Sequence, residues 1–440
     1  MRDYQVSPAL RVSGTLAVPG DKSISHRSLM LCGLADDSSE ITGFLASEDC
    51  LATLNAMRAL GVRVEQPSAT QLLIHGVGLH GLTAAAHPLD MGNAGTAMRL
   101  STGLLAAQCF PSQLIGDASL MKRPMERVAK PLREMGADVR THNGTPPVDI
   151  GGGRSLRGIE YAMPVASAQV KSAILLAGLY ADGATTVTAP AVSRDHSERM
   201  LLSCGVRVVT AGLRTTVYPP QRLAGQRLEV PGDFSSAAFF IVAGLLGAGA
   251  EGLLIRNVGL NPTRTGLLDI LRSMGGEIEV HNARESGAEP VADLRVHASA
   301  LHGITVPISL VPLAIDEFPI LFVAAACARG ETVITGAEEL RVKESDRIAA
   351  MSAGFAALGV RHEVLADGMR IEGRAEGIAF GGGEIDSHGD HRVAMSFAIA
   401  SLRAAQPIRI RDVANVATSF PGFVGLARSV GLAVAESVNG

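Results

Sequence analysis

The sequence predicts an α/β protein made of six copies of one βαβαββ-type unit, with three copies in each of two lobes. Two observations lead to this prediction. Six apolar helices rich in alanine, leucine and glycine recur at intervals of roughly 70 to 80 residues. Each is followed by a second helix that runs into a glycine and then a strand. Helices this uniformly apolar are expected to be buried on all sides, with the strands outside them.

The first unit shows the pattern in full. We expect a buried helix over 25–35, a strand over 39–43, a second helix over 51–60 after Glu48-Asp49, and strands over 62–64 and 71–75. The first helices of the later units are expected to begin near Ala94, Ala168, Ser235, Asp316 and Asp390.

The tetrapeptide Val-Pro-Gly-Asp occurs twice, at 18–21 and at 230–233. Proline and glycine fix abrupt changes of chain direction, so both copies are candidate crossings between the lobes. We therefore expect one lobe over 19–231 and a second made of 1–18 with 232–440. Hinges are expected near Pro19/Gly20 and Pro231/Gly232.

Composition narrows the class of protein. The 440 residues are 47% hydrophobic and 19% charged, which suits large cores and argues against disorder. The net charge of -4, the 4% aromatic content and the lack of tryptophan argue against binding to nucleic acid or to anionic membranes. The five scattered cysteines have no disulfide spacing, and the first residues lack the plan of a signal peptide. We expect a cytoplasmic protein.

Polar and basic residues precede the apolar helices, an unusual place for them. Residues 20–28, Gly-Asp-Lys-Ser-Ile-Ser-His-Arg-Ser, combine a glycine, two cations and three hydroxyls at a helix start, where free N–H groups and the helix dipole favour an anion. The corresponding stretches are 92–96 with Arg99, 167–169 with Lys171, 233–236, 316–317 and 389–392, and basic stretches at 122–124 and 341–347 begin second helices.

Each stretch alone has a plain structural explanation. Residues 20–28 can be a capped helix start with solvated charges, and 92–96 a turn with a helix cap. Asp316 and Asp390 can be N-caps, and Arg347 can pair with Glu344 or Asp346 on an exposed helix face.

Together the stretches indicate a site for a small, multiply anionic ligand between the lobes. They place cations at loop–helix junctions with few carboxylates among them: Lys22, Arg27, Arg123, Lys343, Arg347 and Arg392. The sequence has no H-E-x-x-H and no clustered Cys/His, so we expect no metal. The glycine spacings match neither G-x-G-x-x-G after a strand nor G-x-x-x-x-G-K-[ST], so binding of ATP or NAD is not supported.

Long motifs carry a resemblance in order along nearly the whole chain: GDKSISHRS, GNAGTAMRL, LMKRPM, ASAQVKS, SRDH, AIDEFP, RVKESDR, GDHRVAM and TSFPGF. The sequence resembles the 5-enolpyruvylshikimate-3-phosphate synthase family. The resemblance implies the family's two-lobed inside-out α/β barrel, the enolpyruvyl transferase fold. It also implies transfer of the enolpyruvyl group of phosphoenolpyruvate to the 5-hydroxyl of shikimate 3-phosphate, without cofactor or metal.

The resemblance also assigns residues by motif position. Shikimate 3-phosphate would be held by Lys22, Ser23, Arg27, Ser167, Ala168, Gln169, Arg194, Asp316 and Lys343. Phosphoenolpyruvate would be held by Lys22, Gly95, Arg123, Gln169, Arg347 and Arg392. Asp316 and Glu344 match the acid/base carboxylates, with Lys22 assisting. Asp316 is the candidate base for the 5-hydroxyl, and either Glu344 or Lys22 can protonate the methylene carbon. We expect a raised pKa for Glu344 when it is desolvated near bound anions.

The chain departs from the family pattern in places. Many members carry a lysine just before the C-terminal Phe-Pro, where this chain has Thr418-Ser419, so that cationic contact is not carried over. Ser-Arg-Asp-His at 193–196 marks a divergent branch of the family, in which Arg194 and not an aromatic residue is the expected extra contact. Gly95 leaves space beside phosphoenolpyruvate, which predicts inhibition by glyphosate.

Two alternatives remain. The sister transferase that acts on UDP-N-acetylglucosamine uses a reactive cysteine in a mobile loop, and the corresponding residues 117–125 contain none. A non-catalytic, anion-binding repeat protein would not need Lys22, Asp316, Glu344 and Arg392 together at helix starts. We expect a monomer.

Overall fold

The computed structural model describes residues 2–438. By their internal contacts these residues divide into two compact units. Unit 1 consists of residues up to 19, Pro231–Arg284 and residues from Pro290 onward, and unit 2 consists of Gly20–Val230 and Glu285–Glu289. Each unit has its own hydrophobic core.

Unit 2 contains three successive repeats. The first consists of α1 (Lys22–Gly33), β3 (Ser38–Thr42), α2 (Glu48–Ala59), β4 (Arg63–Ser68) and β5 (Gln71–His75). The second consists of β6 (Leu89–Asp90), α3 (Gly95–Leu105), β7 (Ser112–Ile115), the 3₁₀ turn η1 (Leu120–Lys122), α4 (Glu126–Glu134), β8 (Val139–His142) and β9 (Thr145–Ile150). The third consists of β10 (Glu160–Ala162), α5 (Ala168–Gly178), β11 (Thr185–Thr188), α6 (His196–Ser203), β12 (Val208–Ala211) and β13 (Arg214–Val217), and β14 (Arg227–Glu229) follows.

The three sheets of unit 2 share one pattern. Their strand orders are β14-β3-β5-β4, β6-β7-β9-β8 and β10-β11-β13-β12. In each, the first strand lies parallel to the second, and the remaining pairs are antiparallel. The leading strand of the first sheet, β14, comes from the end of the third repeat, so the chain closes the unit on itself.

Unit 1 contains the other three repeats and two N-terminal strands, β1 (Arg2–Ser7) and β2 (Val12–Ala17). The fourth repeat consists of α7 (Phe234–Gly247), β15 (Ala248–Gly259), α8 (Gly266–Ser273), β16 (Ile278–Ser286) and β17 (Glu289–Val296). The fifth consists of η2 (Ile308–Leu310), α9 (Val311–Ala314), η3 (Ile315–Glu317), α10 (Phe318–Ala326), β18 (Gly330–Ile334), η4 (Glu338–Val342), α11 (Arg347–Ala357), β19 (His362–Leu365) and β20 (Gly368–Gly373). The sixth consists of β21 (Gly383–Asp386), α12 (His391–Ala400), η5 (Ser401–Arg403), β22 (Ile408–Arg411), η6 (Ala414–Thr418), α13 (Phe423–Ser429) and β23 (Ala433–Val438).

The sheets of unit 1 repeat the same pattern and draw on the N-terminal strands. β2 lies parallel to β15 as the leading strand of β16-β17-β15-β2, and β1 lies between β22 and β23 in β21-β22-β1-β23. The third sheet, β18-β20-β19, is extended by parallel bridges from His302 and Thr305 to the β18 side. The expected repeat of six βαβαββ-type units is therefore confirmed in residues 2–438.

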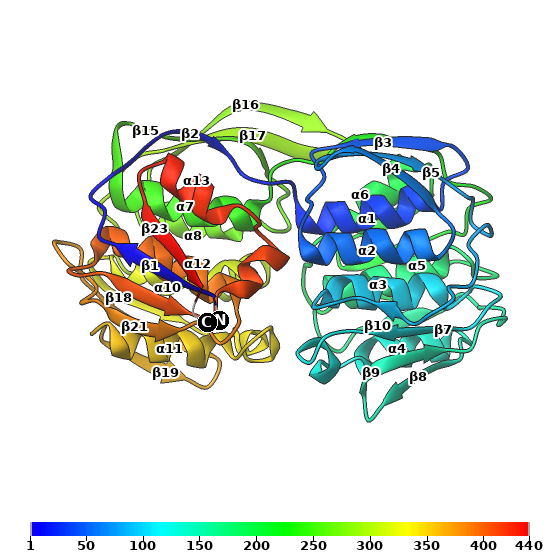
Figure 1. Cartoon of the computed structure of the whole chain (residues 1–440). Coiled ribbons are helices and arrows are strands. Elements are labelled where there is room, and N and C mark those ends of the chain that lie inside the picture. Colours follow the sequence, from blue (N-terminus) through cyan, green and yellow to red (C-terminus); the bar gives the residue numbers. More distant parts are fainter. Residues whose placement is uncertain (1, 439–440) are drawn as a thin grey trace. The chain divides into compact units, whose positions relative to one another are not determined.

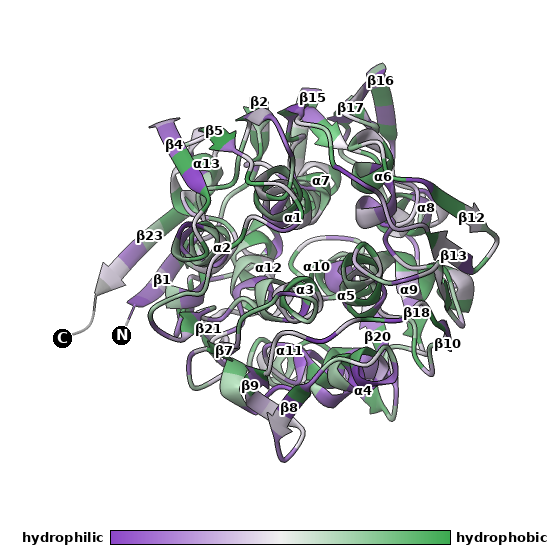
Figure 2. Cartoon of the chain, turned by 90° about the vertical axis from the view of Figure 1, so that its right-hand side faces the viewer, coloured by the Kyte–Doolittle hydropathy of each residue, from purple (hydrophilic) through white to green (hydrophobic). Residues whose placement is uncertain are grey.

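Within each unit the helices lie inside the strands (Figure 1). In unit 2, α1, α3 and α5 occupy the centre, with α2, α4 and α6 around them and the strands at the periphery (Figure 2). In unit 1, α7, α10 and α12 pack against one another. In α7 every residue except Leu246 is buried, as are all residues of α10 and α12. The prediction that the first helices are buried is confirmed. Of the five cysteines, four are buried and Cys109 is exposed.

One helical run is long and apolar enough to span a bilayer by length and composition. It covers Ile308–Ala326, and 61% of its apolar window is buried inside the protein. The run is made of four short segments, η2, α9, η3 and α10, and the last of them lies in the core of unit 1. A mostly buried core helix explains its composition.

Both helices of the first repeat begin earlier than the sequence predicts. α1 starts at Lys22, not Ser25, because the side chain of Asp21 caps it by accepting from the N–H of Ile24 at 2.9 Å. α2 starts at Glu48 behind the Ser47 cap, so Glu48 and Asp49 form its first turn. Residues expected in loops therefore lie on the first turns of helices, where the backbone fixes the direction of their side chains.

Candidate active site

Arg27 is the most buried cation among the predicted site residues of unit 2, at 4% exposure. From α1 it donates to the Ser197 hydroxyl at 2.7 Å, the Ser172 hydroxyl at 2.8 Å and the Ser23 carbonyl at 2.9 Å. Burial lowers the pKa of Arg27 to about 10, the nearby carboxylates of Glu198, Asp21 and Glu289 oppose that shift, and the charge of Arg194 adds to it. The guanidinium remains charged at neutral pH, and its hydrogen bonds are all to neutral groups, so it retains the capacity to attract an anion.

Lys22 lies on the first turn of α1 and pairs with Asp49 on the first turn of α2. Its Nζ is 2.9 Å from Asp49 Oδ2, and the Lys22 side chain is one-fifth exposed. An ammonium at a helix N-terminus, steadied by one carboxylate and open to solvent, is well suited to meet a phosphate or carboxylate.

Gln169, on the first turn of α5, joins two repeats of unit 2. Its Oε1 accepts from Arg99 at 2.9 Å, and its Nε2 donates to the Thr96 hydroxyl at 2.8 Å. Ser167 is the N-cap of α5 and accepts from the N–H of Val170 at 3.4 Å, and Ala168 is the first residue of this helix. Ser167 and Gln169 therefore both have structural partners.

Gly95 begins α3 beside two guanidinium groups. A Cβ there would lie 2.8 Å from Arg99 Nη1 and 3.0 Å from Arg123 Nη1, closer than side chains ordinarily approach. Arg123 donates to the Asn93 side chain at 2.6 Å. A side chain at position 95 would displace the guanidinium groups of Arg99 and Arg123, and glycine avoids this. Arg194, half-buried just before α6, belongs to the same unit.

In unit 1, Arg347 is the centre of an ion-pair cluster and is 1% exposed. Its guanidinium lies 2.8 Å from Asp390, 2.6 Å from Glu344 and 3.4 Å from Asp316. Burial opposes its charge, but Asp390, Glu344 and Asp316 together raise the pKa of Arg347. The alternative that Arg347 pairs with Glu344 is confirmed, but the exposed helix face expected with it is wrong.

Asp316 connects the remaining predicted residues of this unit. Its Oδ1 is 3.6 Å from Lys343 Nζ, and its backbone carbonyl accepts from Arg392 at 3.0 Å. Asp316 lies in the 3₁₀ turn η3, so the alternative that it is a helix N-cap is wrong. The same alternative is correct for Asp390, which accepts from the N–H of Arg392 at 2.8 Å.

The expectation of few carboxylates among the cations is wrong. The missed partners are Asp49, Asp390 and Glu317, and the last lies 3.8 Å from Arg392. Each comes from a helix start other than that of its cation, so no local spacing links the pair. A signal was available at Asp49 and Asp390, because both stand at helix N-termini where acids are favoured.

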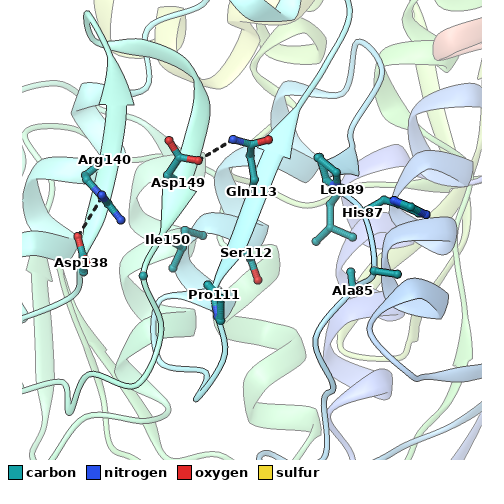
Figure 3. Close-up of a pocket in the computed structure, with 13 residues that line it drawn as sticks. Ala85, His87, Leu89, Pro111, Ser112, Gln113, Asp138, Arg140, Asp149 and Ile150 are labelled. Atoms are coloured by element: carbon teal, nitrogen blue, oxygen red, sulfur yellow. Dashed lines mark hydrogen bonds and ion pairs between the residues drawn. The ribbon is translucent and has the colours of Figure 1, made fainter.

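Two other features lie outside the predicted residues. In unit 2 a cavity of about 610 Å³ is lined by residues 85–89, 111–113, 138, 140 and 149–151, and Gln113 bonds to Asp149 across neighbouring strands (Figure 3). In unit 1 the donor atoms of Glu277, Glu279 and His297 lie within 4.8 Å of one another. This second group is accounted for by pairing: Glu279 lies 2.7 Å from His281 and 3.5 Å from His297.

The family model for EPSP synthase (3-phosphoshikimate 1-carboxyvinyltransferase) matches residues 6–426. The chain belongs to this family. A 3-phosphoshikimate 1-carboxyvinyltransferase of Methylococcus capsulatus is 57% identical over 435 residues, covering 99% of this chain and 98% of that protein. One from Legionella pneumophila is 53% identical and covers 99% and 100%. The structure of EPSP synthase from Acinetobacter baumannii aligns over 100% of both chains, with a TM-score of 0.90 and 51% identity. The family's inside-out α/β fold is thus the fold of this chain.

Proposed function

We propose that the chain transfers the enolpyruvyl group of phosphoenolpyruvate to the 5-hydroxyl of shikimate 3-phosphate and releases phosphate. The observation that carries the proposal is the match over nearly the whole chain to curated 3-phosphoshikimate 1-carboxyvinyltransferases. The sister reaction on UDP-N-acetylglucosamine is not favoured by this match, and the cysteine expected for it is missing from residues 117–125.

The chemistry is addition followed by elimination. The 5-hydroxyl oxygen bonds to C2 of phosphoenolpyruvate, its proton passes to a base, and the methylene carbon takes a proton from an acid. The resulting tetrahedral ketal phosphate then loses phosphate as its C–O bond breaks, and the methyl group returns a proton to form the enol ether. We assign the base to Asp316 and the acid to Glu344 or Lys22.

The geometry of unit 1 supports the carboxylate assignments. Arg347 lies between Glu344 and Asp316, at 2.6 and 3.4 Å, so one buried guanidinium orients both groups. A guanidinium beside a carboxylate favours its ionised form, which suits Asp316 as base. Glu344 would then need a bound anion or loss of water to take up a proton, and its raised pKa in the complex stays a prediction.

Binding of the reactants is proposed by residue. Shikimate 3-phosphate is assigned to Lys22, Ser23, Arg27, Ser167, Ala168, Gln169, Arg194, Asp316 and Lys343. Phosphoenolpyruvate meets Lys22, Gly95, Arg123, Gln169, Arg347 and Arg392. Both reactants are anionic, and charge-assisted bonds to guanidinium and ammonium groups hold them in an attack geometry.

Thr418 is not a substitute for the family's C-terminal lysine in this proposal. It is buried at the end of η6, and its hydroxyl donates to the Asn415 carbonyl at 2.7 Å, a helix-terminal bond. We further propose that glyphosate inhibits the protein by competing with phosphoenolpyruvate beside Gly95, and that the protein is a cytoplasmic monomer.

The direct test is release of inorganic phosphate from phosphoenolpyruvate by the purified protein, with shikimate 3-phosphate or UDP-N-acetylglucosamine as acceptor. Release is expected with shikimate 3-phosphate alone, accompanied by a product that carries an enolpyruvyl ether. Release only with UDP-N-acetylglucosamine, or with neither acceptor from a folded sample, contradicts the proposal.

A further inference from the structure

The polar stretch 233–236 at the start of α7 has no role in the reaction as proposed above, although it stands where the other repeats carry binding residues. Asp233 is the N-cap of α7 and accepts from the N–H of Ser236 at 2.8 Å, which accounts for Asp233 and Ser236. Ser235 is not part of the cap. Its side chain is buried and joins a set of charged residues in unit 1.

The Ser235 hydroxyl bridges two buried ions of opposite charge. It accepts a hydrogen bond from Arg264 Nη2 at 2.8 Å and donates its own to Glu317 Oε1. Arg264 is 2% exposed and Glu317 is 1% exposed. A hydroxyl has one proton to give and lone pairs to receive, so Ser235 satisfies both neighbours at once.

Glu317 connects this bridge to Arg392. The same Oε1 lies 3.8 Å from Arg392 Nη1, which itself donates to the backbone carbonyl of Asp316 at 3.0 Å. Glu317 Oε2 is buried and has no hydrogen-bond partner among residues 2–438. Two cations flank this buried carboxylate: Arg392 on one side, and Arg264 beyond Ser235 on the other.

We propose that Ser235, Glu317 and Arg264 form a positioning network that fixes the guanidinium of Arg392 for phosphoenolpyruvate. The inference rests on the proposed function, in which Arg392 contacts that substrate. Ser235 holds the Glu317 carboxylate in one rotamer, and Glu317 together with the Asp316 carbonyl holds one edge of Arg392, so that its remaining N–H groups stay available to an anion. The three residues are positioning residues and touch no reacting atom.

The test measures KM for each substrate and kcat for Ser235→Ala. Loss of the hydroxyl frees Glu317, so KM for phosphoenolpyruvate is expected to rise about tenfold. KM for shikimate 3-phosphate and kcat are expected to change less than about threefold, since Arg392 is assigned to phosphoenolpyruvate binding. Ser235→Thr restores a hydroxyl and is expected to recover most of the lost affinity.

A matched control is Thr332→Val in the same unit. Thr332 is 0% exposed and its hydroxyl has no hydrogen-bond partner among the described residues, so this variant removes a buried hydroxyl outside the network. It is expected to leave both KM values unchanged. Glu317→Gln, of nearly the same shape, is the second test of the network and is read in the same way if Ser235→Ala does not fold.

Whether the network acts through Arg392 is decided by a double-mutant cycle. In an Arg392→Ala background, Ser235→Ala is expected to have no further effect on KM for phosphoenolpyruvate. The inference is overturned if the two effects multiply, or if Ser235→Ala and Glu317→Gln both keep the wild-type KM. Failure of the proposed function is a separate result, since it is seen as no phosphate release by the wild-type protein.

Discussion

Arg27 of unit 2, on α1, and Arg347 of unit 1, on the first turn of α11, are both buried arginines, yet their hydrogen-bond partners differ in charge. Arg27 is held by two serine hydroxyls and a carbonyl, and burial lowers its pKa to about 10. Arg347 is held by three carboxylates, which raise its pKa. The hydrogen-bond partners of Arg27 are neutral, so they do not offset its positive charge, and an anionic ligand can pair with it. The charge of Arg347 is paired with carboxylates, and it orients Asp316 and Glu344.

The difference predicts a division of labour, in which the two sets of residues affect different kinetic quantities. Changes to Asp316 and Glu344, the assigned carboxylates beside Arg347, should act on the chemical step, whereas changes to Arg27 of unit 2 should act on substrate affinity. The predictions that follow test this division.

The largest effect is expected from Asp316→Asn and Glu344→Gln. Loss of a general acid or base should lower kcat by on the order of 10² to 10⁴, with smaller changes in KM. Steady-state kinetics with both substrates varied measures the effect. Glu338→Gln is the matched control, because Glu338 is exposed in η4. Turnover near wild type in either site variant would remove that residue from the chemistry.

A smaller effect, mainly on KM and not on kcat, is expected from Arg27→Lys. An ammonium cannot reproduce the planar contacts to Ser172 and Ser197, so KM for shikimate 3-phosphate should rise roughly 10- to 100-fold. The kcat should fall much less. Arg58→Lys controls for loss of a structural arginine in the same unit, since Arg58 donates to the Val64 carbonyl at 2.9 Å. A lower kcat at unchanged KM would break the division of labour.

Gly95→Ala is expected to act on a single substrate site. The new Cβ meets Arg99 and Arg123 at 2.8 and 3.0 Å, and displacement of these guanidinium groups should raise both KM for phosphoenolpyruvate and the inhibitory concentration of glyphosate about tenfold. Inhibition assays against varied phosphoenolpyruvate provide the measurement. Gly183→Ala, whose Cβ would meet nothing within 4 Å, should behave as wild type. Unchanged glyphosate inhibition in Gly95→Ala would place the inhibitor elsewhere.

The smallest effect concerns His26, another buried group of unit 2 with a neutral partner. His26 lies 2.7 Å from the Thr53 hydroxyl, and burial, with Lys22 and Arg27 nearby, holds its pKa well below 6.5. The unfolded chain therefore binds a proton that the folded chain does not, and the stability of unit 2 should fall as pH drops below about 6.5, by ~1.4 kcal/mol per pH unit from this group.

Denaturant unfolding of wild type and His26→Gln between pH 7.5 and pH 5 measures this contribution. The variant should lose less stability over that range, because glutamine does not titrate. Parallel pH dependence in the two proteins would show that His26 does not set the acid response.

The sequence predicted the repeats because each first helix is apolar over its whole length and each second helix ends at a glycine, and these are local signals. The predicted helix starts were too late where one N-cap residue sets the start, as Asp21 does for α1 at Lys22. The sequence could not predict the partners of the cations, because these come from far along the chain. Ser197 lies 170 residues from Arg27, and Asp390 lies 43 residues from Arg347.

The most direct test of the division of labour is a single-turnover rapid-quench experiment on Glu344→Gln, with the affinity for shikimate 3-phosphate measured on the same sample by calorimetry. We expect the chemical step to slow by a factor of about 10² or more, with affinity for shikimate 3-phosphate within about threefold of wild type. A chemical step at the wild-type rate with weakened binding would contradict this expectation, and would assign Glu344 to substrate binding and not to the chemical step.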